Sequence, residues 1–144
     1  MAAFVKYEAT VEHFMTKVHD LLGTGGSIDA IKVYLSNTAP DVATDAVKAD
    51  MAEFAGGTGY TAGGASVTPV GTRTGGTYTL AGTDIVWTAG AGDWVAFRYA
   101  VLYNDTPSSP ADPLLGYWDY GSALTLGNGE TFTLDFGASI FTLA

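Results

Sequence analysis

The feature that most constrains the fold is the apolar stretch Asp93–Asp105, which is rich in aromatic and β-branched residues. This composition favours a strand over a helix. Successive side chains of a strand point to opposite sides, and in this stretch both sides are apolar. Such a strand lies in the centre of a layered structure or is covered by another subunit. We therefore expect the rest of the chain to be organised around it.

Arg98 is the exception within this apolar strand. A charge between two apolar faces needs a partner of opposite sign. Asp119, on the next predicted strand, is the nearest candidate, and Asp84 and Asp135 are alternatives. We predict a structural ion pair between Arg98 and Asp119 rather than a ligand-binding arginine.

The N-terminal region predicts a helix over Tyr7–Leu22, because apolar residues recur there at steps of three and four. We expect residues 1–26 to form a helical arm that either docks on its own domain or reaches a neighbouring subunit. A second, short helix is predicted over residues 44–55. His13 and His19 are six residues apart, on different faces of a helix, so the spacing does not favour a metal-binding pair.

Residues 27–144 predict short strands separated by Gly-rich and Pro-rich turns, and no linker divides the 144-residue chain. We expect one domain, mainly β, folded as an antiparallel β-sandwich of the jelly-roll or immunoglobulin-like kind with the two helices added. The predicted strands and hairpins are Asp29–Ser36, Val67–Thr72 paired with Thr77–Leu80 across Gly75 and Gly76, Ile85–Thr88, Ala123–Leu126 paired with Glu130–Phe136 across Gly127–Gly129, and a closing strand in Ser139–Leu143. Pro69 cannot donate a backbone hydrogen bond, which predicts an edge position for its strand.

Composition limits the partners. The chain has 15 acidic and 6 basic residues, a net charge of −9, which argues against nucleic acid or an anionic membrane as partner. No apolar run approaches the roughly 20 residues of a membrane-spanning helix. Only 15% of the residues are charged and the mean hydropathy is +0.19, so we expect part of the surface to be covered in a homo-oligomer or larger assembly.

The sequence contains few patterns typical of catalytic sites. The chain has no cysteine, and its Gly-rich segments lack the phosphate-binding and dinucleotide patterns. No serine lies in a Gly-x-Ser-x-Gly elbow. The acids Asp112, Asp119 and Glu130 are too scattered to favour glycoside hydrolysis. We expect a non-enzymatic protein without cofactor or metal.

The most suggestive cluster is Tyr117, Trp118 and Tyr120 on one predicted strand. Aromatic side chains of this kind pack in cores and at interfaces, and they also stack on sugars. Packing in the core or at an interface is the favoured interpretation. Glycan stacking is the alternative, and it would make the chain a carbohydrate-binding module.

Several segments together resemble small structural proteins of tailed bacteriophage virions, of the capsid-decoration, head-fibre-base or tail type. The resemblance covers most of the chain after residue 28 and carries no catalytic residues. The segments that carry it are Gly59–Gly64, Asp84–Ala89, Phe97–Asp105, Pro113–Gly121 and Gly129–Phe132.

The resemblance implies a non-enzymatic virion protein. We expect a capsid decoration (cement) protein that binds the major capsid protein on the outer surface of the head and stabilises the shell. A tail or head-fibre component is the alternative within this class, and the carbohydrate-binding module is the alternative outside it.

Overall fold

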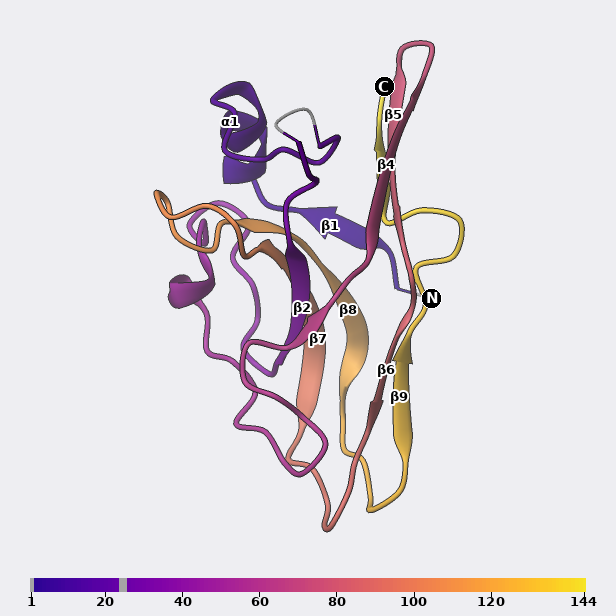
Figure 1. The fold of residues 1–144 in the computed structure, drawn as a ribbon. Helices are drawn as coiled ribbons and strands as arrows, with labels where there is room; N and C mark the ends of the chain where they lie inside the picture. Colours follow the sequence, from indigo (N-terminus) through magenta and orange to yellow (C-terminus); the bar gives the residue numbers. More distant parts are fainter. Residues whose placement is uncertain (1, 24–25) are drawn as a thin grey trace.

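The computed structural model describes residues 2–23 and 26–144, and the chain is mainly β, with antiparallel sheets and one α-helix in this part (Figure 1). A five-stranded sheet has the order β1-β8-β7-β2-β3, and two smaller sheets have the orders β10-β5-β4 and β6-β9. The elements are β1 Phe4–Lys6, α1 Ala9–Met15, β2 Ile31–Ser36, a 3₁₀ turn Lys48–Asp50, β3 Ala65–Ser66, β4 Pro69–Thr74, β5 Thr77–Gly82, β6 Ile85–Thr88, β7 Phe97–Asn104, β8 Leu114–Leu124, β9 Thr131–Leu134 and β10 Phe141–Leu143.

The apolar stretch forms β7, which lies between β2 and β8. Both of its faces are covered by the chain itself, as the pattern predicted for a central strand. Phe97, Ala100 and Leu102 belong to one buried cluster, and Tyr99, Val101 and Tyr103 to another. The pairing with β8 shifts register between Phe97 and Tyr99. This irregularity puts Phe97 on the opposite side from Tyr99, where simple alternation would have placed them together.

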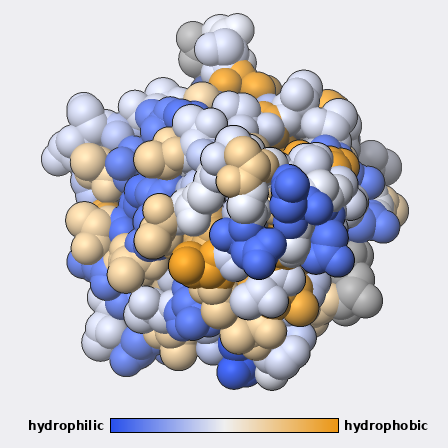
Figure 2. All heavy atoms as spheres, turned by 90° about the horizontal axis from the view of Figure 1, so that it is seen from below, coloured by the Kyte–Doolittle hydropathy of each residue, from blue (hydrophilic) through white to orange (hydrophobic). Residues whose placement is uncertain are grey.

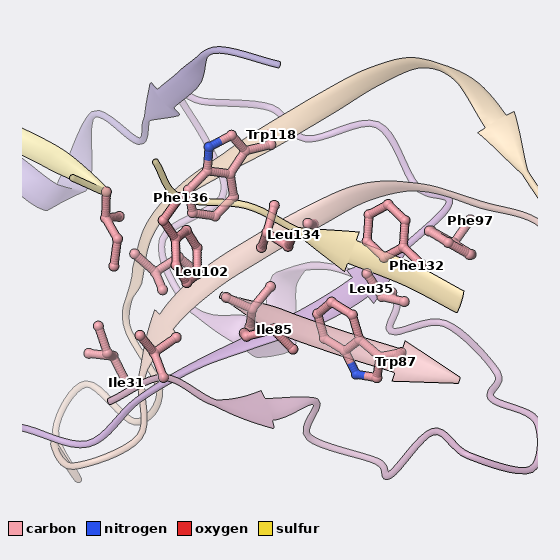
Figure 3. Close-up of a cluster of buried hydrophobic side chains, with 14 of the residues drawn as sticks. Ile31, Leu35, Ile85, Trp87, Phe97, Leu102, Trp118, Phe132, Leu134 and Phe136 are labelled. Atoms are coloured by element: carbon pink, nitrogen blue, oxygen red, sulfur yellow. The ribbon is translucent and has the colours of Figure 1, made fainter. Parts of the chain in front are cut away.

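One face of the five-stranded sheet packs against the two smaller sheets, which run along the right-hand side of Figure 1. We call β4, β5, β6, β9 and β10 the second layer. Figure 3 shows side chains from both layers meeting in this core. Trp87 stacks on Phe132 with ring centroids 5.7 Å apart, and the ring of Phe97 lies edge-on to Phe132 at 5.0 Å. Leu134 is completely buried among them.

The other face of the sheet is covered by Tyr7 and by an irregular segment around Val47–Met51. Lys48 places its ammonium group over the rings of Tyr34 and Tyr103, at 5.1 and 5.8 Å from the ring centroids. The Tyr7 hydroxyl donates to the sulfur of Met51 at 3.0 Å. This face therefore combines aromatic packing with specific polar contacts.

The predicted N-terminal helical arm is wrong in extent. Phe4–Lys6 is a strand that pairs with β8, and the helix covers only Ala9–Met15. The helix ends where Lys17 adopts a left-handed conformation, with φ of 61°, and the Thr16 hydroxyl bonds back to the Glu12 carbonyl at 2.8 Å. The region is docked rather than extended, because Tyr7 is completely buried.

The predicted helix over residues 44–55 is also wrong, since only the short 3₁₀ turn Lys48–Asp50 forms. Apart from the bonds of this turn, the backbone of the region bonds to the chain around the start of β8. Leu114 N–H donates to the Ala46 carbonyl at 2.9 Å, and Lys48 N–H donates to the Asp112 carbonyl at 2.9 Å. Tertiary hydrogen bonds thus replace the helical ones.

The hairpin predicted across Gly75 and Gly76 is confirmed as β4–β5, and Pro69 lies on the edge strand β4. The hairpin predicted across Gly127–Gly129 has the right turn and the wrong partner. Its second strand, β9, pairs with β6 instead of β8. The chain after β8 crosses to the second layer, where the inward side chains Phe132 and Leu134 of β9 join the core. The closing strand is confirmed in part, as β10.

Candidate interaction surface

The predicted Arg98–Asp119 pair forms with bidentate geometry: Arg98 Nε and Nη2 donate to the two Asp119 oxygens at 2.7 and 2.9 Å. Hydrogen bonds from Arg98 and from Gly121 N–H hold the pKa of Asp119 below its usual value. The pair is not buried, as the two side chains are 37% and 36% exposed. Arg98 lies at the irregular part of the β7–β8 pairing, which turns its side chain toward solvent. The predicted ion pair therefore forms, but at the surface and not between two apolar faces.

Tyr117, Trp118 and Tyr120 do not share a surface. Trp118 is 3% exposed and packs in the core, with its ring 5.1 Å from Phe4. Tyr117 lies on the opposite face of the sheet, beside Tyr7. Tyr120 is half-buried against Phe132 in the core, at 5.0 Å. A ligand cannot stack on all three rings, because neighbouring positions of β8 point to opposite sides.

A threonine-rich surface, not recognised in the sequence, covers the side of the second layer that faces away from the core. Leu80, Trp87, Phe132 and Leu134 point inward, so the residues that alternate with them point outward. Cross-strand register places these outward residues in rows, such as Thr72 opposite Thr79. We call this surface the outer face, and it comprises Val70, Thr72, Thr74, Thr77, Thr79, Ala81, Val86, Thr88, Thr131, Thr133 and Thr142.

None of these positions is acidic or basic, but the exposed acids Asp84 and Asp135 continue the outward rows of β6 and β9 at one end. Val70 and Val86 are 54% and 59% exposed on the outer face. The sequence signal is threonine at alternate positions in three strands, at 72 and 74, at 77 and 79, and at 131 and 133. Alternation predicts a strand, but only the arrangement of the sheets puts these rows on one side of the molecule.

The end of the molecule seen in Figure 2 has a different character. It carries the loops that connect β6 to β7 and β8 to β9, and its surface mixes hydrophilic residues with small, separate hydrophobic areas. An open hollow of about 410 Å³ lies here between Asp93, Trp94, Leu126 and Glu130. Both acidic side chains bond to the backbone of the β8–β9 loop. Glu130 accepts a hydrogen bond from Gly127 N–H at 2.6 Å, and Asp93 accepts one from Asn128 N–H at 3.2 Å.

A second hollow, of about 200 Å³, lies between the turn after α1 and the β5–β10 pair, lined by Phe14, His19, Leu21, Tyr78 and Leu143 among others. His13 and His19, expected on different helix faces, have their rings 5.6 Å apart because the helix ends before His19. Within the described residues no group of three or more His, Asp or Glu side chains has the arrangement of a metal site. No helix of the described chain is long and apolar enough to cross a membrane.

Comparison of the chain with protein-family models, with curated proteins and with solved structures found no match.

Proposed function

We propose that this protein is a non-enzymatic structural component of a bacteriophage virion, a cement protein that binds the outside of the assembled capsid. The facing antiparallel sheets are proposed to be a β-sandwich of the jelly-roll or immunoglobulin-like kind, since two layers share one core. The sequence resemblance suggests this class of protein. The single structural observation in support is the threonine-rich outer face, whose strand positions carry no charge.

The outer face is suited to contact with a large protein shell. A chain with a net charge of −9 is repelled by acidic surfaces, and this repulsion is weakest where a face has no charge of its own. Threonine loses little side-chain entropy when it is buried, and its hydroxyl can exchange a water for a partner across an interface. Exposed Val70 and Val86 add apolar area. Contact of this kind depends only modestly on salt.

A cement protein stabilises a shell by binding only its assembled state. Each occupied site then adds to the stability of the shell by mass action. Many small contributions, repeated over the shell, resist the pressure of packaged DNA. The major capsid protein is the partner in this proposal.

The experiment uses bare particles, prepared without this protein, and the purified protein added back. We expect complete particles to release DNA at a higher temperature than bare ones, and added protein to restore the difference. Equal release temperatures, together with no binding to bare particles, would reject the cement role. Mass-spectrometric copy number separates the alternatives, because a few copies per particle and binding on a glycan array would favour a fibre component or a carbohydrate-binding module.

The outer face is tested with matched valine variants. The double variant Val70→Lys/Val86→Lys places two charges on the outer face, and we expect at least tenfold weaker binding to bare particles. The control Val11→Lys/Val95→Lys changes two valines that are 52% and 54% exposed elsewhere, and we expect it to bind like the wild type. Equal binding by both variants would show that the outer face is not the contact.

Self-association is a separate part of the proposal. The two apolar faces of β7 are covered within the chain, so they are not available to a second copy. The strand β4 lies at the edge of its sheet, and an edge strand can pair with another chain. Light scattering at micromolar concentration tests this point, and a monomer alone would contradict it.

A further inference from the structure

A buried polar network joins the turn after α1 to β2 and β7, and Asn104 is its centre. Asn104 is completely buried at the end of β7. Its Oδ1 accepts from Thr106 N–H at 3.0 Å, so its Nδ2 is the donor. Nδ2 donates to Asp29 Oδ2 at 2.7 Å and contacts His19 Nδ1 at 3.0 Å. The two N–H groups of the amide thus have two acceptors.

These contacts determine the protonation state of His19. Since Asn104 donates to Nδ1, that nitrogen carries the lone pair and the proton lies on Nε2. A metal ion at Nε2 would require the proton to move to Nδ1, where it would meet the Asn104 N–H. The same conflict arises when His19 gains a second proton. The contact with Asn104 therefore favours a neutral His19 imidazole, whose Nε2–H is buried without a hydrogen-bond partner within the described structure.

The surroundings of His19 also oppose a positive charge. Its side chain is 8% exposed, and the ring of Phe14 lies 5.1 Å away. The titratable groups around it are His13 on α1, Asp29 ahead of β2, the adjacent Asp20, and Tyr78 of β5 across the hollow. The carboxylate of Asp29 favours the protonated form of His19, but its Oδ2 already accepts hydrogen bonds from Asn104 and from Asp20 N–H, each at 2.7 Å. Burial, followed by repulsion from His13, lowers the pKa of His19 to about 4.

We propose that the His19–Asn104–Asp29 network is an acid-sensitive latch, which fastens α1 and the following turn to the five-stranded sheet while His19 is neutral and releases them when His19 is protonated. This inference does not depend on the proposed function. The network does more than pack the segment, because all of its hydrogen bonds can form only while His19 is neutral.

The latched segment has further attachments that must open with the latch. The Asp29 N–H donates to the Asp20 carbonyl at 2.9 Å, the Tyr78 hydroxyl donates to the Leu21 carbonyl at 2.7 Å, and Leu21 is buried in the core. The seven-residue helix α1 is too short to be stable by itself. The Thr10 hydroxyl contacts the carbonyl oxygens of Leu114 and Leu115, and Phe14 packs edge-on against Phe141. The Asp20 N–H bonds directly to the Asp29 carboxylate, so its exchange with solvent reports on the latch.

The direction of the pH effect follows from the two protonation equilibria. When α1 and the following turn are released (the open state), His19 has the ordinary pKa of about 6.5. When they are fastened to the sheet (the closed state), its pKa is about 4. Acid therefore favours the open state from pH 6.5 downward, and the effect is complete below pH 4. The open population rises about tenfold per pH unit in this window, on the order of 100-fold between pH 7 and pH 4.5.

Hydrogen exchange, measured on the full chain between pH 7.5 and pH 4 and corrected for the intrinsic rate at each pH, tests the latch. We expect peptides covering residues 9–22 to lose protection by about that factor, while β7 peptides stay protected. The variant His19→Asn keeps an acceptor near the Nδ1 position and cannot be protonated, so its exchange should not change with pH. The control His13→Asn should keep the acid-induced opening.

Three results would overturn the proposal. The first is that acid leaves the exchange protection of residues 9–22 unchanged in the wild type. The others are that His19→Asn loses this protection in acid as the wild type does, or that β7 loses its protection at the same time. An NMR titration of the His19 ring in the wild type gives a test that does not require the variant to fold. Titration near pH 6.5 without any opening of the segment would reject the latch.

Discussion

The two faces of the five-stranded sheet are both buried, but they are covered in different ways. The face toward the second layer packs against regular strands, through side chains such as Phe97, Leu102 and Leu134 that carry no polar group. The opposite face is rich in tyrosine and is covered by an irregular segment. Regular strands satisfy their own backbone groups within a sheet, whereas an irregular cover needs side chains to do so.

A cluster of polar contacts holds the irregular cover in place, and Glu53 is its centre. Glu53 accepts from Lys48 Nζ at 2.7 Å, from the Tyr60 hydroxyl at 2.8 Å and from Gly63 N–H at 2.6 Å. The Tyr103 hydroxyl donates to the Gly63 carbonyl at 2.8 Å. One face of the sheet therefore depends on packing volume, and the other depends on a few directional contacts.

The largest expected effect is on the packed face. Phe97 is completely buried and contacts the rings of Phe54, Trp94 and Phe132. The change Phe97→Ala should lower the free energy of unfolding by about 3–5 kcal/mol, because it removes apolar area and leaves a cavity. Denaturant-induced unfolding measures this. A loss below about 1 kcal/mol would mean that this face is not tightly packed.

An intermediate effect is expected on the polar cover. The change Glu53→Ala should cost roughly 2 kcal/mol, because three donors lose their acceptor. Glu53→Gln keeps an acceptor oxygen and should cost less. If both variants unfold like the wild type, directional contacts do not hold the cover.

The same cluster predicts a pH dependence. Burial alone raises the pKa of Glu53, but the hydrogen bonds from Lys48, Tyr60 and Gly63 outweigh it, so the pKa is lowered overall. A carboxyl group with a lowered pKa stabilises the fold above its ordinary value near 4.5, and this contribution is lost as the pH falls through the folded-state value. The difference in unfolding free energy between wild type and Glu53→Gln should therefore shrink toward low pH. A constant difference would contradict this assignment.

A smaller effect, of opposite sign, is expected at Tyr34. Its hydroxyl is buried and has no hydrogen-bond partner within the described structure. Tyr34→Phe removes this unsatisfied group and should leave stability unchanged or raise it by up to about 1 kcal/mol. Tyr103→Phe, the matched control, loses the bond to Gly63 and should destabilise the protein. A thermal unfolding series of the two variants decides between these outcomes, and equal losses would contradict the distinction.

The smallest effect is expected at the Arg98–Asp119 pair. Both side chains are more than a third exposed, so solvent screens the pair. Arg98→Ala and Asp119→Asn should unfold close to the wild type, at low and at high salt. A clear, salt-dependent loss of stability in both variants would show that the pair closes the tyrosine-rich face.

Part of this fold was predictable from local pattern. The two apolar sides of Phe97–Asn104 predicted a strand covered on both faces, and Gly75 and Gly76 predicted the β4–β5 turn. The hairpin assigned to β9 failed because turn residues show where a chain reverses but not which edge is free to receive it. The outer face could not be predicted from the sequence. Alternation shows which residues share one side of a single strand, but a continuous surface also depends on which strands lie next to one another and in what register.

The sequence by itself determined the β-rich class and the central strand, because these depend on alternation, which is a local property. It predicted Asp119 as the partner of Arg98 with Asp84 and Asp135 as alternatives, and the pairing of β7 with β8 selected Asp119. Tertiary structure alone decided that Arg98 is exposed, since an irregular pairing with β8 turns it outward. It also decided that residues 44–55 are not an α-helix, because Ala46 bonds to Leu114 at the start of β8 and Lys48 bonds to Asp112. The proximity of His19 to Asn104, 85 residues away in the chain, is likewise a property of the folded chain, because only packing brings the turn after α1 to the end of β7.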